Sequence, residues 1–146
     1  MMYTGPLLCI VGPTASGKSA VAERVADLVS GEVVSIDAMQ VYVGMDIGTA
    51  KTPVFERRRS LHMIDICPIT ESYSVERFQA DARSCIDTLR AAGIAPVLCG
   101  GTGLYLNAVI DEMDFAPGCR GDARRAAYEE LARREGADYL HGLLVE

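Results

Sequence analysis

Residues 12–19 fill all four fixed positions of the pattern G-x-x-x-x-G-K-[ST]. An apolar run at 7–11 precedes the pattern, and residues 20–25 have the spacing of a helix. In such a strand–loop–helix unit, backbone N–H groups and the positive end of the helix surround an anion. Lys18 adds a mobile cation, and Ser19 can reach a Mg²⁺ ion on the bound phosphate. We therefore expect a di- or triphosphate to bind the whole loop: Gly12, Pro13, Thr14, Ala15, Ser16, Gly17, Lys18 and Ser19.

The composition indicates one small compact domain and no membrane span. Of the 146 residues, 49% are hydrophobic, but no apolar run approaches the ~20 residues that a bilayer span requires. Residues 1–6 contain no basic segment, so we expect no signal peptide. The formal net charge of −6 argues against non-specific binding to nucleic acid.

The five cysteines indicate a reducing compartment. Their number is odd, none forms a C-x-x-C pair, and Cys9 and Cys99 lie inside apolar strand patterns. We therefore expect small buried thiols and a cytoplasmic protein. His62 and His141 are far apart in the sequence and suggest no metal site. We expect the chain to be a monomer.

Apolar strands alternate with helical patterns through residues 1–110. The expected strands are 7–11, 33–36, 62–66 and 95–99, and the expected helices are 18–29, 53–59, one from the N-cap Ser74 to Gly93, and 104–110. This order predicts an α/β, P-loop NTPase-like fold, with a mostly parallel sheet and helices on both faces. The apolar stripe of the first helix is expected to comprise Val21, Val25, Leu28 and Val29.

Residues 113–146 differ from the α/β core expected at 1–112. They contain helical patterns at 122–135 and 137–145 and resemble the start of a helical subdomain. Arginines cluster at 57–59, 124–125 and 133–134. Each cluster has two interpretations, a solvated helix face or a local basic face for a polyanion.

Three loops are expected at the carboxyl edge of the sheet, where open parallel sheets bind ligands. They are the phosphate loop at 12–19, the segment 37–40 and the glycine-rich turn 100–103. Asp37 could bind Mg²⁺, act as a general base or cap a turn. The turn 100–103 offers further N–H groups and the Thr102 hydroxyl, or is a tight strand-to-helix connection.

These blocks together resemble the tRNA dimethylallyltransferases (tRNA isopentenyltransferases). The resemblance rests on the phosphate loop and on residues 35–42, 45–51, 62–65 and 100–106, in matching order and spacing. It implies that the loop holds dimethylallyl diphosphate. The implied reaction is alkyl transfer to the exocyclic amine of the adenosine just 3′ of the anticodon in tRNA.

The resemblance also implies roles for individual residues. Asp37 would take the amine proton, and Thr102 would assist at the reacting centre, so these two are the candidate catalytic residues. Gln40 would contact the acceptor base. The candidate tRNA-binding residues are Asp37, Ala38, Met39, Gln40, Thr102 and Arg125. Residues 113–146 would then be RNA-facing, Ser19 would bind Mg²⁺, and the partners would be the tRNA anticodon loop and dimethylallyl diphosphate.

The chain departs from this family in two ways. Ala38 stands where many members have serine, which removes a hydroxyl contact, and the family's members are about twice as long as these 146 residues. Alternative functions are an adenylate isopentenyltransferase, a P-loop kinase for a small metabolite, or a non-catalytic nucleotide-binding module. The kinase interpretation explains the phosphate loop and Asp37 but leaves residues 45–51 and 100–106 unexplained.

Overall fold

The computed structural model describes residues 1–111, 113, 115 and 123–143. The chain divides into two compact units, Met1–Met113 and Asp114–Glu146. The first unit contains, in order, β1 (Leu8–Val11), α1 (Lys18–Leu28), β2 (Gly31–Ser35), the 3₁₀ turn η1 (Val54–Glu56), β3 (Leu61–His62), α2 (Val75–Ala91), β4 (Ala95–Gly100) and α3 (Gly103–Ile110).

The described strands form one parallel sheet in the order β1-β4-β2-β3. In this register Val97 of β4 lies opposite Leu8 on one side and Val33 on the other. Because all strands run the same way, the loops that follow β1, β2 and β4 leave from a single edge. The predicted parallel α/β fold is confirmed.

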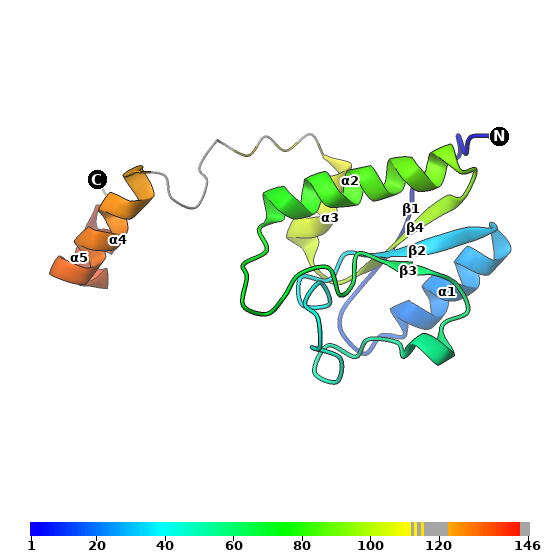
Figure 1. Ribbon diagram of the computed structural model, residues 1–146, viewed down its shortest axis with the longest axis horizontal. Helices are drawn as coiled ribbons and strands as arrows, with labels where there is room; N and C mark the ends of the chain where they lie inside the picture. Colours follow the sequence, from blue (N-terminus) through cyan, green and yellow to red (C-terminus); the bar gives the residue numbers. More distant parts are fainter. Residues whose placement is uncertain (112, 114, 116–122, 144–146) are drawn as a thin grey trace. The chain divides into compact units, whose positions relative to one another are not determined.

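The helices of this unit cover both faces of the sheet, as predicted (Figure 1). Successive strand residues point to opposite faces, so Val33 and Val97 pack against α1, whereas Val34 and Leu98 pack against α2 and α3. On the α2–α3 face, the rings of Phe78 and Tyr105 stack with centroids 4.0 Å apart. This larger cluster fixes the positions of the loops that emerge between β2, β4 and α3.

The predicted apolar stripe of α1 is wrong. Ala22 and Ala26 are fully buried against the sheet, whereas Val21 is 51% exposed and Leu28 is 72% exposed. Of the predicted stripe, Val25 is partly buried on this face. Small side chains bring the helix close to the sheet, so the alanines form the contact although the valines are more hydrophobic.

Two predicted elements are shorter than expected. The strand or extended segment expected at 62–66 is β3, which ends at His62, because Met63 and Asp65 have φ of +60° and +54° and interrupt the extended backbone. The helix expected at 53–59 is the single turn η1, with Pro53 as its N-cap. The predicted N-cap of α2 is confirmed, because the Ser74 Oγ accepts a hydrogen bond from the Arg77 N–H at 3.1 Å.

The thiols of the described residues are not all buried. Cys67 and Cys99 are buried, but Cys9 is exposed, which contradicts the expectation for Cys9. It lies on β1, the edge strand, where burial alternates between partly buried and exposed residues. Cys119 lies outside the described residues. In the same described portion, no helix is long and apolar enough to cross a membrane.

The second unit contains α4 (Ala123–Glu135) and α5 (Ala137–Gly142). Gly136 separates the helices with φ of +88°, a conformation that glycine adopts without steric cost. Exposed ion pairs along α4 join Arg125 to Glu129 and Arg133 to Glu130. These contacts favour the helix by modest amounts, because both partners remain in water.

Candidate functional site

The phosphate loop connects β1 to α1, as the sequence predicts. Gly17 is the N-cap of α1 with φ of +82°, and no atom lies within 4 Å of the place its Cβ would occupy. A glycine is therefore required here for backbone conformation rather than for space. The Lys18 ammonium folds back over the loop and donates to the Pro13 carbonyl at 2.6 Å. The cation thus lies at the loop whose N–H groups would surround a phosphate.

A polar cavity next to this loop joins all three loops at the sheet edge. It is lined by Thr14, Ala15, Lys18, Ser19, Asp37, Gln40, Thr49, Ala50, Cys99 and Gly100. The structure thus brings the loop cation, a hydroxyl, a carboxylate and an amide around one space. Thr102 lines a neighbouring cavity together with Gly12 and Pro13.

Asp37 lies two residues after the end of β2 and organises the next turn. Its Oδ1 accepts hydrogen bonds from the backbone N–H groups of Met39 at 2.8 Å and Gln40 at 3.3 Å. Among the described residues, no donor contacts its Oδ2. The carboxylate therefore caps a turn and also keeps one oxygen available to a ligand, so the structural and functional interpretations of this residue are compatible.

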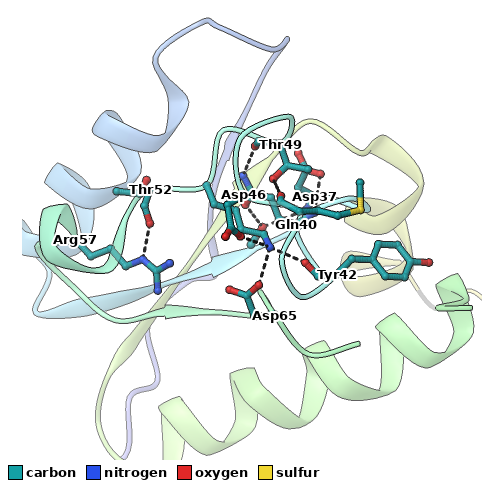
Figure 2. Close-up of polar contacts among 11 residues, drawn as sticks. Asp37, Gln40, Tyr42, Asp46, Thr49, Thr52, Arg57 and Asp65 are labelled. Carbon is teal, nitrogen blue, oxygen red and sulfur yellow. Dashed lines mark hydrogen bonds and ion pairs between the residues drawn. The ribbon is translucent and has the colours of Figure 1, made fainter. Parts of the chain in front are cut away.

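The Gln40 amide is fixed from two sides. Its Oε1 accepts from the Ser35 hydroxyl at 2.9 Å, and its Nε2 donates to the Thr49 carbonyl at 3.0 Å (Figure 2). A carbonyl can only accept, so the nitrogen must face Thr49 and the oxygen must face Ser35. Sequence reasoning missed both partners, although Ser35 was visible as a polar residue inside an apolar strand.

In the glycine-rich turn after β4, neighbouring atoms leave little room for a side chain at two of the glycines. A Cβ on Gly100 would lie 2.7 Å from Ile36 Cγ1, and one on Gly101 would lie 3.1 Å from the Gly12 carbonyl. Nothing lies within 4 Å of the corresponding point on Gly103. The tight-turn interpretation therefore accounts for Gly100 and Gly101, whichever ligand the site takes.

Comparison with protein-family profiles assigns the chain to a family. The profile described as IPP transferase matches residues 40–146, and the profile described as isopentenyl transferase matches residues 6–66. The chain belongs to the IPP transferase family. Relatives named tRNA dimethylallyltransferase include that of Frankia casuarinae, 51% identical over 139 residues, with 94% of this chain and 47% of the relative covered. That of Carboxydothermus hydrogenoformans is 45% identical, with 94% and 45% covered.

Solved structures agree with this family assignment. The full-length tRNA isopentenylpyrophosphate transferase of Bacillus halodurans matches with a TM-score of 0.73 and 42% identity, over 94% of this chain and 46% of that one. A eukaryotic dimethylallyltransferase acting on tRNA matches with a TM-score of 0.70 and 25% identity, over 88% and 35%. The fold is therefore P-loop NTPase-like. The chain spans about half the length of the curated relatives it matches.

The three arginines at 57–59 differ in their contacts and in their exposure to solvent. Arg59 Nε donates to Asp27 Oδ1 of α1 at 2.7 Å, and this hydrogen bond holds the pKa of Asp27 below its usual range. Arg57 Nε donates to the Thr52 carbonyl at 2.7 Å (Figure 2). These two contacts tie the segment before β3 to α1 and to itself, whereas Arg58 is 65% exposed along its side chain. Of the cluster at 57–59, Arg58 is thus the cation most open to solvent.

Of the predicted tRNA-binding residues, Asp37 and Gln40 line the polar cavity, and the others do not. Met39 is exposed beside Asp37, with 47% of its surface accessible. Arg125 belongs to the second unit and pairs with Glu129 at 3.1 Å. Ala38 remains at the site, because its backbone N–H donates to Thr102 Oγ1 at 3.1 Å.

Cys99 forms part of the cavity wall but is not a candidate nucleophile. Burial raises the pKa of its thiol, and the nearby Lys18 ammonium only partly opposes this effect. The thiol therefore stays protonated near pH 7, and Cys99 acts as a small apolar residue in the cavity wall.

Proposed function

We propose that this chain takes part in transferring a dimethylallyl group from dimethylallyl diphosphate to the exocyclic N6 amine of the adenosine 3′ of the anticodon in tRNA. The observation that carries this proposal is the shared cavity of Lys18, Ser19, Asp37 and Gln40. The names of the relatives supply the substrate class, and the cavity supplies a group for each part of the reaction.

The reaction moves one alkyl group and one proton. The amine nitrogen attacks the allylic carbon, the bond from that carbon to the diphosphate oxygen breaks, and its electron pair leaves with the diphosphate. Lys18 and the N–H groups of the phosphate loop lie where this growing negative charge would be stabilised. The loop thus acts on a leaving group rather than on ATP.

Asp37 is the proposed base for the amine proton. Its Oδ1 is occupied by two backbone N–H groups, which fixes the carboxylate, and its Oδ2 is the oxygen available to accept the proton. A base held by its own turn needs no reorganisation when the acceptor binds.

The acceptor base is proposed to contact Gln40 and Thr102 after leaving its stack in the anticodon loop. Ala38, Met39 and Arg125 are proposed as further tRNA contacts. The exposed side chain of Met39 and the N–H of Ala38 both belong to the turn that Asp37 caps.

Mg²⁺ is the proposed cofactor, with the Ser19 hydroxyl as its protein ligand. Ser19 lines the polar cavity beside Lys18. One protein hydroxyl fits Mg²⁺, which binds through few protein oxygens and completes its shell with phosphate oxygens and water. When bound, the ion would neutralise charge on the diphosphate.

The free thiols of the described cysteines support the proposal of a cytoplasmic protein, and we propose that it is a monomer.

The test is transfer of label from dimethylallyl diphosphate to unmodified tRNA and, separately, to AMP. Transfer to tRNA is expected. Transfer only to AMP would shift the assignment to an adenylate isopentenyltransferase, and ATP-dependent phosphorylation of a metabolite without transfer would refute the proposal. Diphosphate binding without any transfer would mean that this chain is a binding module.

Asp37→Asn tests the proposed base, and Asp87→Asn, which removes the same charge elsewhere, is its control. We expect Asp37→Asn to lose transfer by about 100-fold or more, because general-base catalysis contributes on that order, while diphosphate binding is retained. Asp87→Asn, on the exposed side of α2, should leave both properties unchanged. Loss of diphosphate binding in Asp37→Asn would instead assign Asp37 a structural or metal-binding role.

A further inference from the structure

Lys51 is a buried cation that the proposed reaction does not use. Only 2% of its side chain is exposed, and its ammonium donates to three oxygens. These are the Tyr42 carbonyl at 2.6 Å, Asp65 Oδ1 at 2.6 Å and Asp46 Oδ1 at 3.0 Å. Figure 2 shows the three acceptors meeting at one nitrogen. All three ammonium hydrogens are thus used inside the protein, which leaves none for a substrate.

The three acceptors belong to different segments around Gln40. Tyr42 lies just after it, Asp46 is the second residue of the loop 45–51, and Asp65 follows β3. The backbone N–H of Asp65 also donates to the Gln40 carbonyl at 3.1 Å. Lys51 therefore connects the segments that surround Gln40 without contacting the Gln40 side chain.

The backbone on both sides of this ion cluster is strained. Ala50, next to Lys51, has φ of +49°, and Asp65 has φ of +54°. Side chains with a Cβ disfavour this region, so such conformations persist only where surrounding contacts hold them. Asp65 accepts from the Lys51 ammonium and Ala50 is bonded to Lys51, so the ion cluster is one of the contacts that hold these two conformations.

Thr49 connects the loop that Lys51 holds to the Gln40 side chain. Its carbonyl fixes the Gln40 Nε2 at 3.0 Å, and it lies two residues before Lys51 in the same loop. We propose that Lys51 is a positioning residue: by holding the loop 45–51 in place, it fixes the Gln40 amide toward the acceptor base. This inference rests on the proposed function for the identity of the acceptor.

The fixed amide has one remaining N–H on Nε2 and one remaining lone pair on Oε1. A donor and an acceptor side by side match an adenine edge, which is the pairing that glutamine amides make with adenine in nucleic acids. Without Lys51 the loop carbonyl moves, the amide can rotate, and this order of donor and acceptor is lost. Lys51 would therefore act on acceptor recognition and not on the diphosphate.

The kinetic test compares Lys51→Met and Lys51→Arg with the unaltered chain. Lys51→Met should raise the KM for the acceptor by about tenfold, the value of one hydrogen bond, and leave the Kd for dimethylallyl diphosphate within about twofold. Lys51→Arg, which keeps the charge, should recover part of the loss. An equal loss in both acceptor KM and diphosphate Kd would overturn the proposal.

A double-mutant cycle separates positioning from general stability. In a Gln40→Ala background, Lys51→Met should change the acceptor KM little, since the amide it positions is gone. The stability control is Arg83→Gln, which removes the hydrogen bonds from α2 to the Ala108 and Asp111 carbonyls at the end of α3. If Lys51→Met has its full effect without Gln40, or if Arg83→Gln produces the same KM change, the proposal is wrong.

A structural readout tests the inference if no transfer is detected and the proposed function fails for this chain. The Gln40 side-chain NH₂ protons should exchange slowly with water in the unaltered chain and clearly faster in Lys51→Met, as measured by NMR. Asp65→Asn should give an intermediate rate if Lys51→Met does not fold, because it keeps the oxygen and removes the charge. Unchanged exchange in the folded variants would overturn the proposal independently of any activity.

Discussion

The side-chain oxygen of Thr102 accepts a hydrogen bond from the Ala38 backbone N–H at 3.1 Å, joining loops that lie 64 residues apart in the sequence. One loop follows β4 and the other follows β2, and the second carries Asp37. Because the Thr102 oxygen is the acceptor, its own hydrogen stays available as a donor. The hydroxyl can therefore hold the site together and contact a substrate with the same oxygen.

Thr102→Val is expected to destabilise the chain, whereas Thr102→Ser is expected to be close to neutral. Valine has the shape of threonine but offers no acceptor, so the part-buried N–H of Ala38 loses its partner. The expected decrease in the free energy of unfolding is about 1 kcal/mol, toward the lower end for an unpaired donor because the site is only partly buried. Urea denaturation of both variants measures it. Equal stability of the two variants would show that the hydrogen bond contributes nothing measurable.

Gly100→Ala and Gly103→Ala form a matched pair in the same turn. At Gly100 the new Cβ would lie 2.9 Å from the Ile36 carbonyl carbon, part of a backbone that cannot yield without moving β2. We expect a loss of about 1–3 kcal/mol in the free energy of unfolding, as in other overpacked positions. Gly103 begins α3 and has open space at its Cβ, so alanine there should be neutral or stabilising by up to about 1 kcal/mol. Thermal unfolding that ranks the pair in the opposite order would contradict this account.

The element order and the three converging loops could be predicted because they depend on local patterns. A fixed phosphate-loop motif between a strand and a helix sets the direction of β1, and parallel strands place their following loops at one edge. Asp37 could be selected in the same way, as the first polar residue after an apolar strand.

The packing face of α1 could not be predicted in this way. Periodicity permits neighbouring stripes on a helix, and the stripe containing Ala22 lies against the sheet because small residues allow close approach, although Val21 is more hydrophobic. The contacts of Gln40 with Ser35 and Thr49 were likewise hidden, since they depend on how the loop 45–51 folds back. Lys51 is a loop cation in the sequence and a buried ion-pair centre in the fold.

Asp27→Asn should reduce stability at neutral pH and leave it nearly unchanged in acid. The hydrogen bond from Arg59 lowers the pKa of Asp27 in the folded chain below its ordinary value. A lowered carboxyl pKa contributes stability above the unfolded value, about 3.9, and this contribution is lost as the pH falls through the folded pKa. Urea denaturation between pH 3 and pH 7 should therefore show the difference from the unaltered chain shrinking below about pH 4. A difference that stays constant across this range would mean that the ion pair is not the cause.

Lys18→Met should weaken binding of inorganic diphosphate without unfolding the chain. The ammonium contacts only the Pro13 carbonyl among the described residues, at a solvent-exposed position, so its removal leaves little packing to lose. A hydrogen bond to a charged group contributes about 1.5–3 kcal/mol, which corresponds to a loss of roughly 10- to 150-fold in affinity by calorimetry. Raising the salt concentration should weaken binding more in the unaltered chain than in Lys18→Met, because the variant has already lost the charge that salt screens. Equal affinities of the two proteins, or equal salt dependence, would show that the diphosphate binds away from the loop at 12–19.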